Sequence, residues 1–264
     1  MKAIRLLLVS ALWIVSFSQV RAADELPVRI WQVDGVTREA LLHTPPTAAA
    51  VPAPVIFVFH GFAGFMNQAA AAFGYHTLWP EAIVVYMQGL DSPGMRRGSK
   101  VQKPGWQRDV GALDDRDLKF FDAVLASLSQ DYKVDEKRVY AAGHGSGGAF
   151  TYVLWTARGR RFAAMAPSAT IAGLAQLTEL KPKPVLHLAG EKDSLATFDW
   201  QKLTMDGLRK LNRCGEGRPW ENCCTLYPSD IGAPVVTYIH PGRHEFPTNA
   251  TAVIVKFFKE HAQP

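Results

Sequence analysis

The segment AAGHGSGGAF at residues 141–150 lies between a strand-like run and a helix-like run, and its spacing is compatible with two chemistries. Gly143, Gly145 and Gly148 form the G-x-G-x-x-G spacing of a turn whose backbone N–H groups bind the phosphates of a dinucleotide. Alternatively, Gly143 and Gly147 flank the sharp strand-to-helix turn that presents a nucleophilic serine. In the second interpretation the nucleophile position is residue 145, which is glycine.

The dinucleotide interpretation makes a further demand that the sequence does not meet. An acidic residue is expected about 20 positions later, at the end of the next strand, to bind the ribose. The next strand-like run ends AAMAPSA, and Glu179 is the only carboxylate between residues 145 and 190. Binding of a dinucleotide through Gly143, Gly145 and Gly148 is therefore the remote alternative, and no cofactor is expected.

The nucleophile-turn interpretation demands backbone N–H donors for a developing oxyanion. His60 and Gly61 end the apolar run VIFVFHG, so we expect the N–H of Phe62 to point toward a substrate carbonyl oxygen. His60 is then placed beside the substrate, although a histidine at a strand end can also serve only to hydrogen-bond the backbone.

The same interpretation demands an acid and a base, in that order along the chain. Asp193 lies just past the apolar run PVLHLAG, and Glu191 is the alternative acid. The segment YIHPGRHEFP offers two histidines. His240 fits the strand pattern and is expected to be structural, whereas His244 lies in the following loop. We therefore predict that Asp193 orients the imidazole of His244, which acts as general base.

Short apolar runs that alternate with helical patterns must position these groups. An opening hairpin is predicted around Asp34-Gly35. Buried strands are predicted at residues 55–61, 82–89, 138–143, 162–168, 184–190 and 234–242. This alternation predicts an α/β fold of three layers, with a mostly parallel central sheet of about eight strands and helices on both faces.

Two intervening regions carry further predictions. The apolar spacing of Trp200, Leu203, Leu208 and Leu211 predicts one buried helix face. Residues 90–109 lack periodicity, and long loops of this kind are often functional. Trp106 in that loop could form a platform for a flat or sugar-like substrate, or the loop could be an ordinary solvated connection.

The chain begins with a segment typical of export signals. Residues 1–22 combine a basic start, a ten-residue apolar core that is too short to span a bilayer, and a small-residue cleavage site. Removal of this segment leaves one domain, residues 23–264, which is expected to be secreted or periplasmic. Three of the 29 basic residues lie in the signal, so 26 basic residues face 24 acidic ones. This near balance, without a basic stripe, argues against nucleic acid, and no other segment looks membrane-spanning.

The three cysteines, Cys214, Cys223 and Cys224, lie within eleven residues. In an exported protein this clustering predicts one local disulfide with the third thiol left over, and we prefer the pair Cys214 and Cys224. No histidine is near enough in the sequence to complete a zinc site, so no metal is expected.

Over nearly the whole length after the signal, the chain resembles secreted esterases of the feruloyl esterase and polyhydroxybutyrate depolymerase type. The resemblance rests on VFHGFAG, AIVVYMQGLDSPG with PGWQ, RVYAAGHGSGGAF, PVLHLAGEKD and VVTYIHPGRHEFP. It implies an α/β-hydrolase fold and a carboxylic ester hydrolase without metal or organic cofactor. It also implies Asp193 and His244 as acid and base, the N–H groups of Phe62 and Ser146 as oxyanion donors, and a disulfide between Cys214 and Cys224.

The chain departs from that family where its nucleophilic serine stands, at Gly145. Ser146 is the candidate displaced nucleophile, but the side chains of consecutive residues diverge, and the bulky His144 would precede it by two. Three hypotheses follow: an esterase that has lost its serine by a single change, a pseudoenzyme that binds an ester, aromatic or glycan ligand, or a slow hydrolase using Ser146 or water activated by His244. Small-molecule or polymeric esters are the expected ligands.

Overall fold

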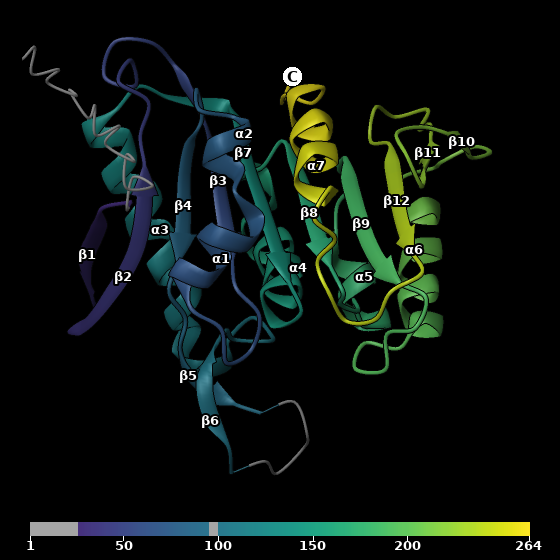
Figure 1. Cartoon of the computed structure of the whole chain (residues 1–264), viewed down its shortest axis with the longest axis horizontal. Coiled ribbons are helices and arrows are strands. Elements are labelled where there is room, and N and C mark those ends of the chain that lie inside the picture. Colours follow the sequence, from purple (N-terminus) through teal and green to yellow (C-terminus); the bar gives the residue numbers. More distant parts are fainter. Residues whose placement is uncertain (1–25, 95–99) are drawn as a thin grey trace, which may run out of the picture.

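The computed structural model describes residues 26–94 and 100–264, so the predicted signal at residues 1–22 lies outside the described residues. A ten-stranded sheet runs through the molecule in the order β1-β2-β4-β3-β7-β8-β9-β12-β11-β10 (Figure 1). Its strands are β1 (Val28–Val33), β2 (Val36–His43), β3 (Ala53–Phe59), β4 (Ile83–Met87), β7 (Val134–His144), β8 (Ala164–Ser168), β9 (Val185–Gly190), β10 (Arg218–Pro219), β11 (Cys224–Tyr227) and β12 (Val235–His240).

The six central strands are parallel, and they are the six that the apolar runs predict. Every residue of β3, β4, β8 and β9 is buried, as expected for strands covered on both faces. The antiparallel pair β1 and β2 turns at Asp34-Gly35, also as predicted. Together these strands give the α/β-hydrolase fold, with the carboxyl ends of the parallel strands at one edge of the sheet.

Helices cover both faces of this sheet. They are α1 (Met66–Phe73), α2 (Tyr75–Leu78), α3 (Arg116–Asp131), α4 (Ser146–Arg158), α5 (Leu174–Glu179), α6 (Phe198–Leu211) and α7 (Ala250–Lys259), with 3-10 turns η1 (Ala112–Asp115) and η2 (Gly159–Arg161). Phe57 of β3 belongs to the apolar core beneath α3, α4, α5 and α6, whereas its neighbour Val58 belongs to the core beneath α1, α2 and α7. Alternate side chains along β3 therefore pack against helices on opposite faces of the sheet, as the three-layer prediction requires.

The sheet has two more strands than the eight predicted. The segment expected to be a cysteine-bearing surface loop forms β10 and β11, which extend the sheet antiparallel beyond β12. The three cysteines are free, which contradicts the predicted disulfide. Cys214 pairs with Ser229 in an isolated β-bridge. Ser229 comes five residues after Cys224, in an extended segment that begins with β11. At about 3.3 Å per residue, this separation exceeds the 4.4–6.8 Å between Cα atoms that a disulfide spans.

The buried face of α6 also differs from the prediction. Leu208 is buried, but Trp200 and Leu203 are more than half exposed. Gln201, Thr204 and Met205 are buried in their place. Gln201 and Thr204 can occupy the interior because each has hydrogen-bond partners there, Gln201 with Asp193 and Thr204 with Ala172.

The predicted loop at residues 90–109 contains a two-stranded hairpin, β5 (Leu90–Pro93) with β6 (Gln102–Gly105). In Figure 1 this hairpin extends from the edge toward which β8, β9 and β12 point, which is the edge where the predicted site residues gather. No helix among residues 26–94 and 100–264 is long and apolar enough to cross a membrane.

Candidate active site

The turn from β7 into α4, residues 143–147, has the backbone of a nucleophile elbow. Gly145 adopts φ 56° and ψ −116°, a conformation that strains any residue with a side chain, and its N–H donates to the carbonyl of Ser168 at 2.9 Å. A Cβ on Gly143 would lie 2.4 Å from the backbone of Gly147, and one on Gly147 would lie 2.2 Å from the carbonyl oxygen of Phe59. The two flanking glycines are therefore required by close backbone approach.

Position 145 is the one that faces the base. A Cβ placed on Gly145 would lie 3.0 Å from Nε2 of His244 and 3.9 Å from Cα of Gly61. Any side chain at this position would thus enter the space between the imidazole and the loop after β3. The position that the sequence suggests for a nucleophile therefore faces the imidazole of His244, and as glycine it carries only hydrogen.

Ser146 does not take over this role in the structure. Its side-chain oxygen is buried and makes no hydrogen bond within the described part of the chain. It is therefore not paired with His244, and the interpretation of Ser146 as a displaced nucleophile is not supported by the geometry. The backbone explains this, because residue 146 is the first residue of α4 and its side chain departs in a different direction from that of residue 145.

Asp193 and His244, the predicted acid and base, are brought together across 51 residues. Nδ1 of His244 lies 2.9 Å from Oδ2 of Asp193, so Nδ1 carries the proton and Nε2 is left as the acceptor that faces Gly145. The carboxylate is fully buried, whereas the imidazole is about one quarter exposed. Oδ1 of Asp193 accepts the N–H groups of Leu195 and Ala196 at 2.8 and 3.0 Å. These bonds fix the orientation of the carboxylate as a hydrogen-bond acceptor.

The alternative acid and base do not enter the site. Glu191 is exposed, and its backbone N–H donates to the carbonyl of His240. His240 is buried, and its Nδ1 accepts the N–H of Gly242 at 3.2 Å. His240 therefore shapes the loop that delivers His244, in agreement with the structural role expected for it.

The loop after β3 lies against the nucleophile turn. Gly61 approaches the carbonyl of His144, with 3.5 Å between that oxygen and a Cβ placed on Gly61. The N–H groups of Phe62 and Ser146 donate no hydrogen bond in the described residues. That of Ser146 also lies in the first turn of α4, where free N–H groups carry partial positive charge. The two predicted oxyanion donors are therefore N–H groups without an acceptor in the described residues.

His60 and Trp106 were predicted to lie against substrate, but both are buried, with about 2 % exposure, and both hydrogen-bond to the backbone. Nδ1 of His60 donates to the carbonyl of Gly61 at 2.8 Å, and Nε2 accepts the N–H of Gly89 at 2.9 Å. Trp106 stacks on Phe150 and donates from Nε1 to the carbonyl of His60 at 2.8 Å. Both side chains thus hold the loop after β3, which carries Phe62 and is called here the oxyanion loop, through hydrogen bonds on its buried side.

His144 is a further histidine at the site. Its ring centroid lies 5.0 Å from that of His244, and its Nδ1 lies 3.1 Å from Oγ of Ser168. Burial, and secondarily the neighbouring His244, lower the pKa of His144 to about 4. The ring is therefore neutral at neutral pH and packs against the base without competing for its proton.

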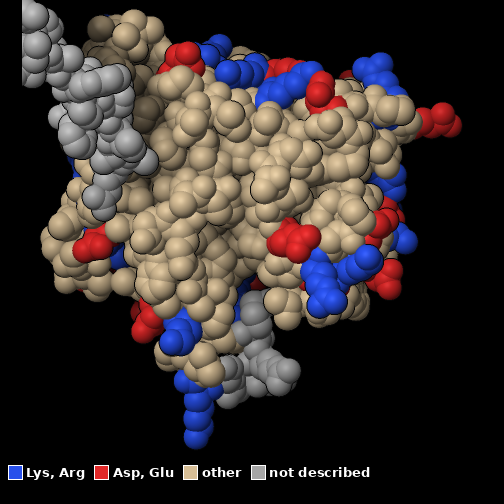
Figure 2. Space-filling view, viewed as in Figure 1, with Lys and Arg blue, Asp and Glu red and all other residues tan. Residues whose placement is uncertain are grey.

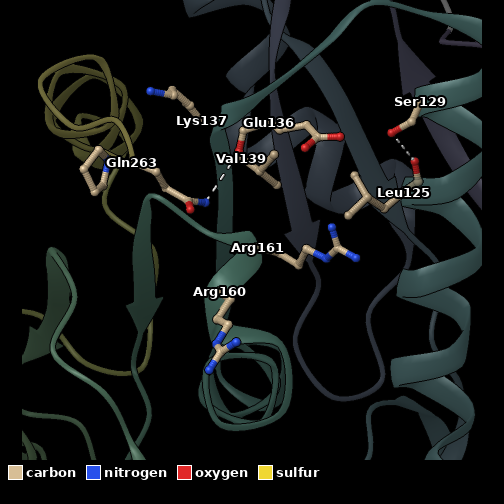
Figure 3. A pocket seen from close by; sticks show the side chains of 9 residues that line it. Leu125, Ser129, Glu136, Lys137, Val139, Arg160, Arg161 and Gln263 are labelled. Atoms are coloured by element: carbon tan, nitrogen blue, oxygen red, sulfur yellow. Dashed lines mark hydrogen bonds between the residues drawn. The ribbon is translucent and has the colours of Figure 1, made fainter.

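A cavity elsewhere in the molecule lacks this chemistry. A cavity of about 210 Å³ beside Lys137, Val139, Arg161 and Gln263 opens near the beginning of β7, at the sheet edge opposite the nucleophile turn (Figure 3). Its charged side chains are solvent-exposed. Figure 2 shows a mostly uncharged molecular face with Lys, Arg, Asp and Glu gathered toward its margins.

The remaining alternatives concern cofactors. Among residues 26–94 and 100–264, no group of three or more His, Cys, Asp or Glu is placed to hold a metal ion. The G-x-G-x-x-G spacing does not create room for a phosphate, because Gly143 and Gly148 contact neighbouring backbone and Gly145 faces an imidazole. The dinucleotide interpretation therefore has no support in the geometry.

Sequence reasoning missed Gln201, whose Nε2 donates to Oδ2 of Asp193 at 3.1 Å. The missed signal was helical spacing, because Gln201, Thr204 and Leu208 recur at intervals of three and four residues and share one face. Polar residues on a face that also carries a buried leucine indicate an internal hydrogen-bond partner.

Comparison with known proteins finds relatives in sequence and in fold. The chain is 26 % identical over 218 residues to a bifunctional acetylxylan esterase/xylanase of Neocallimastix patriciarum, a match that covers 78 % of this chain and 30 % of that protein. An acetyl xylan esterase from Aspergillus awamori has a similar fold, with a TM-score of 0.66, 12 % identity, and coverage of 88 % of this chain and 99 % of that one. A ferulic acid esterase superposes with a TM-score of 0.60 and 13 % identity, covering 89 % and 96 % of the two chains.

These fold neighbours are esterases, and the chain spans less than a third of the length of the acetylxylan esterase/xylanase. Residues 39–213, which include the nucleophile turn and Asp193, match the sequence profile of the Dienelactone hydrolase family. The match covers well over half of the chain and supports carboxylic ester hydrolysis as the class of chemistry. The chain therefore belongs to the dienelactone hydrolase family.

Proposed function

We propose that this protein is a carboxylic ester hydrolase of the feruloyl esterase and polyhydroxybutyrate depolymerase type whose nucleophile is missing. In this proposal it binds an ester in an intact site and hydrolyses it slowly. One observation carries the proposal: a Cβ on Gly145 would lie 3.0 Å from Nε2 of His244, while the backbone holds φ 56° and ψ −116°. The acid, the base and the turn remain arranged around a side chain that is absent.

Residual hydrolysis would use water in place of serine. Nε2 of His244 removes a proton from water as the resulting hydroxide attacks the ester carbonyl carbon. The N–H groups of Phe62 and Ser146 stabilise the oxyanion of the tetrahedral intermediate. Collapse of the intermediate breaks the ester C–O bond, and the protonated His244 returns the proton to the leaving alkoxide. The products are one carboxylic acid and one alcohol.

The ester class follows from resemblance alone. The sequence motifs resemble feruloyl esterases and polyhydroxybutyrate depolymerases, the relative from Neocallimastix patriciarum is named for acetylxylan, and one fold neighbour is named for ferulic acid. A panel of feruloyl, acetyl-xylan, polyester and p-nitrophenyl esters therefore spans the candidate substrates. Export to the periplasm or the medium belongs to the same proposal.

Restoring the serine tests the proposal directly. The variant Gly145→Ser is expected to hydrolyse at least one panel ester about a thousandfold or more faster than the unchanged chain, because loss of a triad nucleophile removes most of the rate. A fluorophosphonate probe should label the hydroxyl introduced at position 145 and should leave the unchanged chain unlabelled. Steady-state rates and mass spectrometry of the labelled protein provide the two measurements.

Two control variants separate the interpretations. Gly145→Ala fills the slot with the same backbone strain but supplies no hydroxyl, so it should show no gain. Ser146→Ala removes only a side chain and keeps the backbone N–H, so it should not remove the gain of Gly145→Ser. A Gly145→Ser variant that binds panel esters without faster hydrolysis would favour the alternative function, a pseudoenzyme that binds an ester or glycan ligand. Fast hydrolysis by the unchanged chain that disappears in Ser146→Ala would contradict the assignment of the slot.

A further inference from the structure

A line of buried polar side chains extends from Asp193 into the core behind the site. It comprises Gln201 of α6, His187 of β9 and Tyr152 of α4, which come from three different elements and are fully buried. None of the three borders the nucleophile turn. Burying a polar side chain costs free energy unless it is hydrogen-bonded. Three such side chains from three elements therefore indicate a shared hydrogen-bond network.

The amide of Gln201 has a defined orientation. Its Nε2 donates to Oδ2 of Asp193 at 3.1 Å and to the carbonyl oxygen of Ala196 at 2.6 Å. An amide whose nitrogen satisfies two acceptors presents its oxygen on the opposite side. Oε1 of Gln201 is buried and has no partner within hydrogen-bonding geometry in the described residues.

His187 supplies the group that this oxygen lacks. Its Nδ1 lies 2.8 Å from the hydroxyl of Tyr152, and its Nε2 is buried without a partner in strict geometry in the same part of the chain. The side chain of Gln201 lies close enough to His187 to affect its pKa, although burial dominates and lowers that pKa to about 4. A neutral imidazole that accepts the Tyr152 hydroxyl proton at Nδ1 carries its own proton on Nε2, so each of two buried atoms without a partner, Nε2 of His187 and Oε1 of Gln201, has the hydrogen-bond capacity that the other lacks.

We propose that Tyr152, His187 and Gln201 form a directional hydrogen-bond relay that positions Asp193 for His244. Every link has one donor and one acceptor: Tyr152 O–H to His187 Nδ1, His187 Nε2–H to Gln201 Oε1, and Gln201 Nε2–H to Asp193 Oδ2. The carboxylate then accepts Nδ1–H of His244 on the same oxygen. Gln201 and His187 are thus positioning residues. The catalytic meaning of the relay depends on the proposed function, but its geometry does not.

The relay explains why the acid is held on both oxygens. Oδ1 of Asp193 is fixed by two backbone N–H groups in its own turn, which restrain the carboxylate from one side. The Gln201 amide restrains Oδ2, the oxygen that holds His244. Reversal of the amide would point an oxygen at the carboxylate, and the proton on Nε2 of His187 opposes that reversal. His187 therefore acts on Asp193 through the orientation of Gln201.

The test uses nuclear magnetic resonance of the chain as it stands, without catalysis. In protein labelled with ¹⁵N-histidine, the Nδ1–H proton of His244, bonded to Asp193, gives a downfield resonance. We expect the variant Gln201→Leu to lose this resonance through exchange with water, and His187→Phe to weaken it. Thr204→Val is the matched control, because Thr204 is buried on the same face of α6 but bonds to Ala172 and Trp200. The control should keep the resonance.

A second measurement uses the Gly145→Ser background. Displacement of a catalytic group by about 1 Å can cost roughly a hundredfold in rate, so Gln201→Leu and His187→Phe should lower kcat about ten- to a hundredfold with little change in KM. If Gln201→Leu does not fold, His187→Phe decides by the same measurements. Folded variants that lose thermal stability while the His244 resonance is unchanged would overturn the relay. A Gly145→Ser protein without activity, but with the resonance lost in Gln201→Leu, would contradict only the proposed function.

Discussion

The two halves of the candidate site differ in what they retain. The acid–base half is complete, since Asp193 accepts hydrogen bonds on both oxygens and His244 is oriented by one of them. The nucleophile half has the backbone of its turn but no side chain at position 145. Packing and a backbone hydrogen bond fix the turn without any side chain at position 145. Gly147 lies against Phe59, and the N–H of Gly145 is bonded to Ser168, independently of any group at position 145.

This difference shows that the geometry of a nucleophile turn is a property of its neighbours. Glycine accepts φ 56° without the cost of about 1–3 kcal/mol that a serine meets there. Glycine at position 145 therefore avoids the strain that a serine would meet at the turn, while in the opposite half Asp193 holds the imidazole of His244 by a hydrogen bond. The predictions below test whether the two halves still work as one site.

The largest effect is expected where the halves must cooperate. If Gly145→Ser restores hydrolysis, adding His244→Ala should remove nearly the whole gain, about a thousandfold or more, because the members of a triad act as a unit. Asp193→Asn should give a comparable loss by favouring the wrong tautomer of His244. Ester hydrolysis by the single and double variants measures the coupling. Independent, additive effects would mean that the restored serine is not activated by His244.

The next effect is on the free energy of unfolding, which should differ between substitutions of Gly147 and Gly145. Gly147→Ala should destabilise the fold by about 3 kcal/mol or more, since its Cβ would lie 2.2 Å from the carbonyl oxygen of Phe59. Gly145→Ala should cost less, on the order of 1–3 kcal/mol, because it meets backbone strain and only a partly exposed imidazole at 3.0 Å. Urea unfolding of the two variants gives the comparison. Equal losses would mean that position 145 is as tightly packed as position 147.

Sequence reasoning was most successful where a pattern has one physical cause. Continuous apolar runs bounded by turns are typical of strands buried on both faces, so all six parallel strands were predicted, and Asp193 and His244 followed from their places beyond strand ends. The elbow was predictable because Gly143 and Gly147 are demanded by backbone contact. These features depend on local order along the chain, which a sequence records directly.

Failures occurred where tertiary partners reversed a local preference. Trp106 was predicted to lie at the surface of a loop, but its ring fills the space beside Phe150 and its N–H satisfies the carbonyl of His60. Trp200 was placed inside α6, but Gln201 occupies the interior because it bonds to Asp193. The cysteines were paired by proximity in the sequence, whereas extended strands separate them. Periodicity can place Gln201 on the buried face of α6, but it does not identify Asp193 as its partner, nor His60 and Phe150 as the partners of Trp106.

A smaller effect is the dependence of stability on pH, which involves one buried histidine from each half, His144 at the turn and His187 in the relay. Burial lowers the pKa of each to about 4, against about 6.5 in an unfolded chain. Between these values the unfolded chain binds more protons, so the free energy of unfolding falls as pH drops from about 6.5 to 4 and is fully retained above 6.5. Each histidine should contribute on the order of 3 kcal/mol to this loss.

Urea unfolding at pH values of about 7.5, 5.5 and 4 measures this dependence, since these values run from above the unfolded-chain pKa of about 6.5 to the lowered pKa of the two histidines. His187→Phe removes one titrating group, so the fall in unfolding free energy between pH 6.5 and 4 should become shallower by about one proton's contribution. His144→Phe should flatten the curve to a similar extent, because both rings are held neutral by burial. A curve that keeps its slope in both variants would show that other groups control acid unfolding.

The smallest effect is expected below the oxyanion loop. Trp106→Phe keeps most of the aromatic packing against Phe150 but removes the donor to the carbonyl of His60, leaving a buried oxygen without its partner. Stability should fall by about 2 kcal/mol. In the Gly145→Ser background, kcat should fall while the Nδ1–H resonance of His244 is unchanged, because Trp106 braces the loop that carries Phe62 and has no link to Asp193. Loss of that resonance would instead show that the two halves share one support, and the contrast drawn between them would fail.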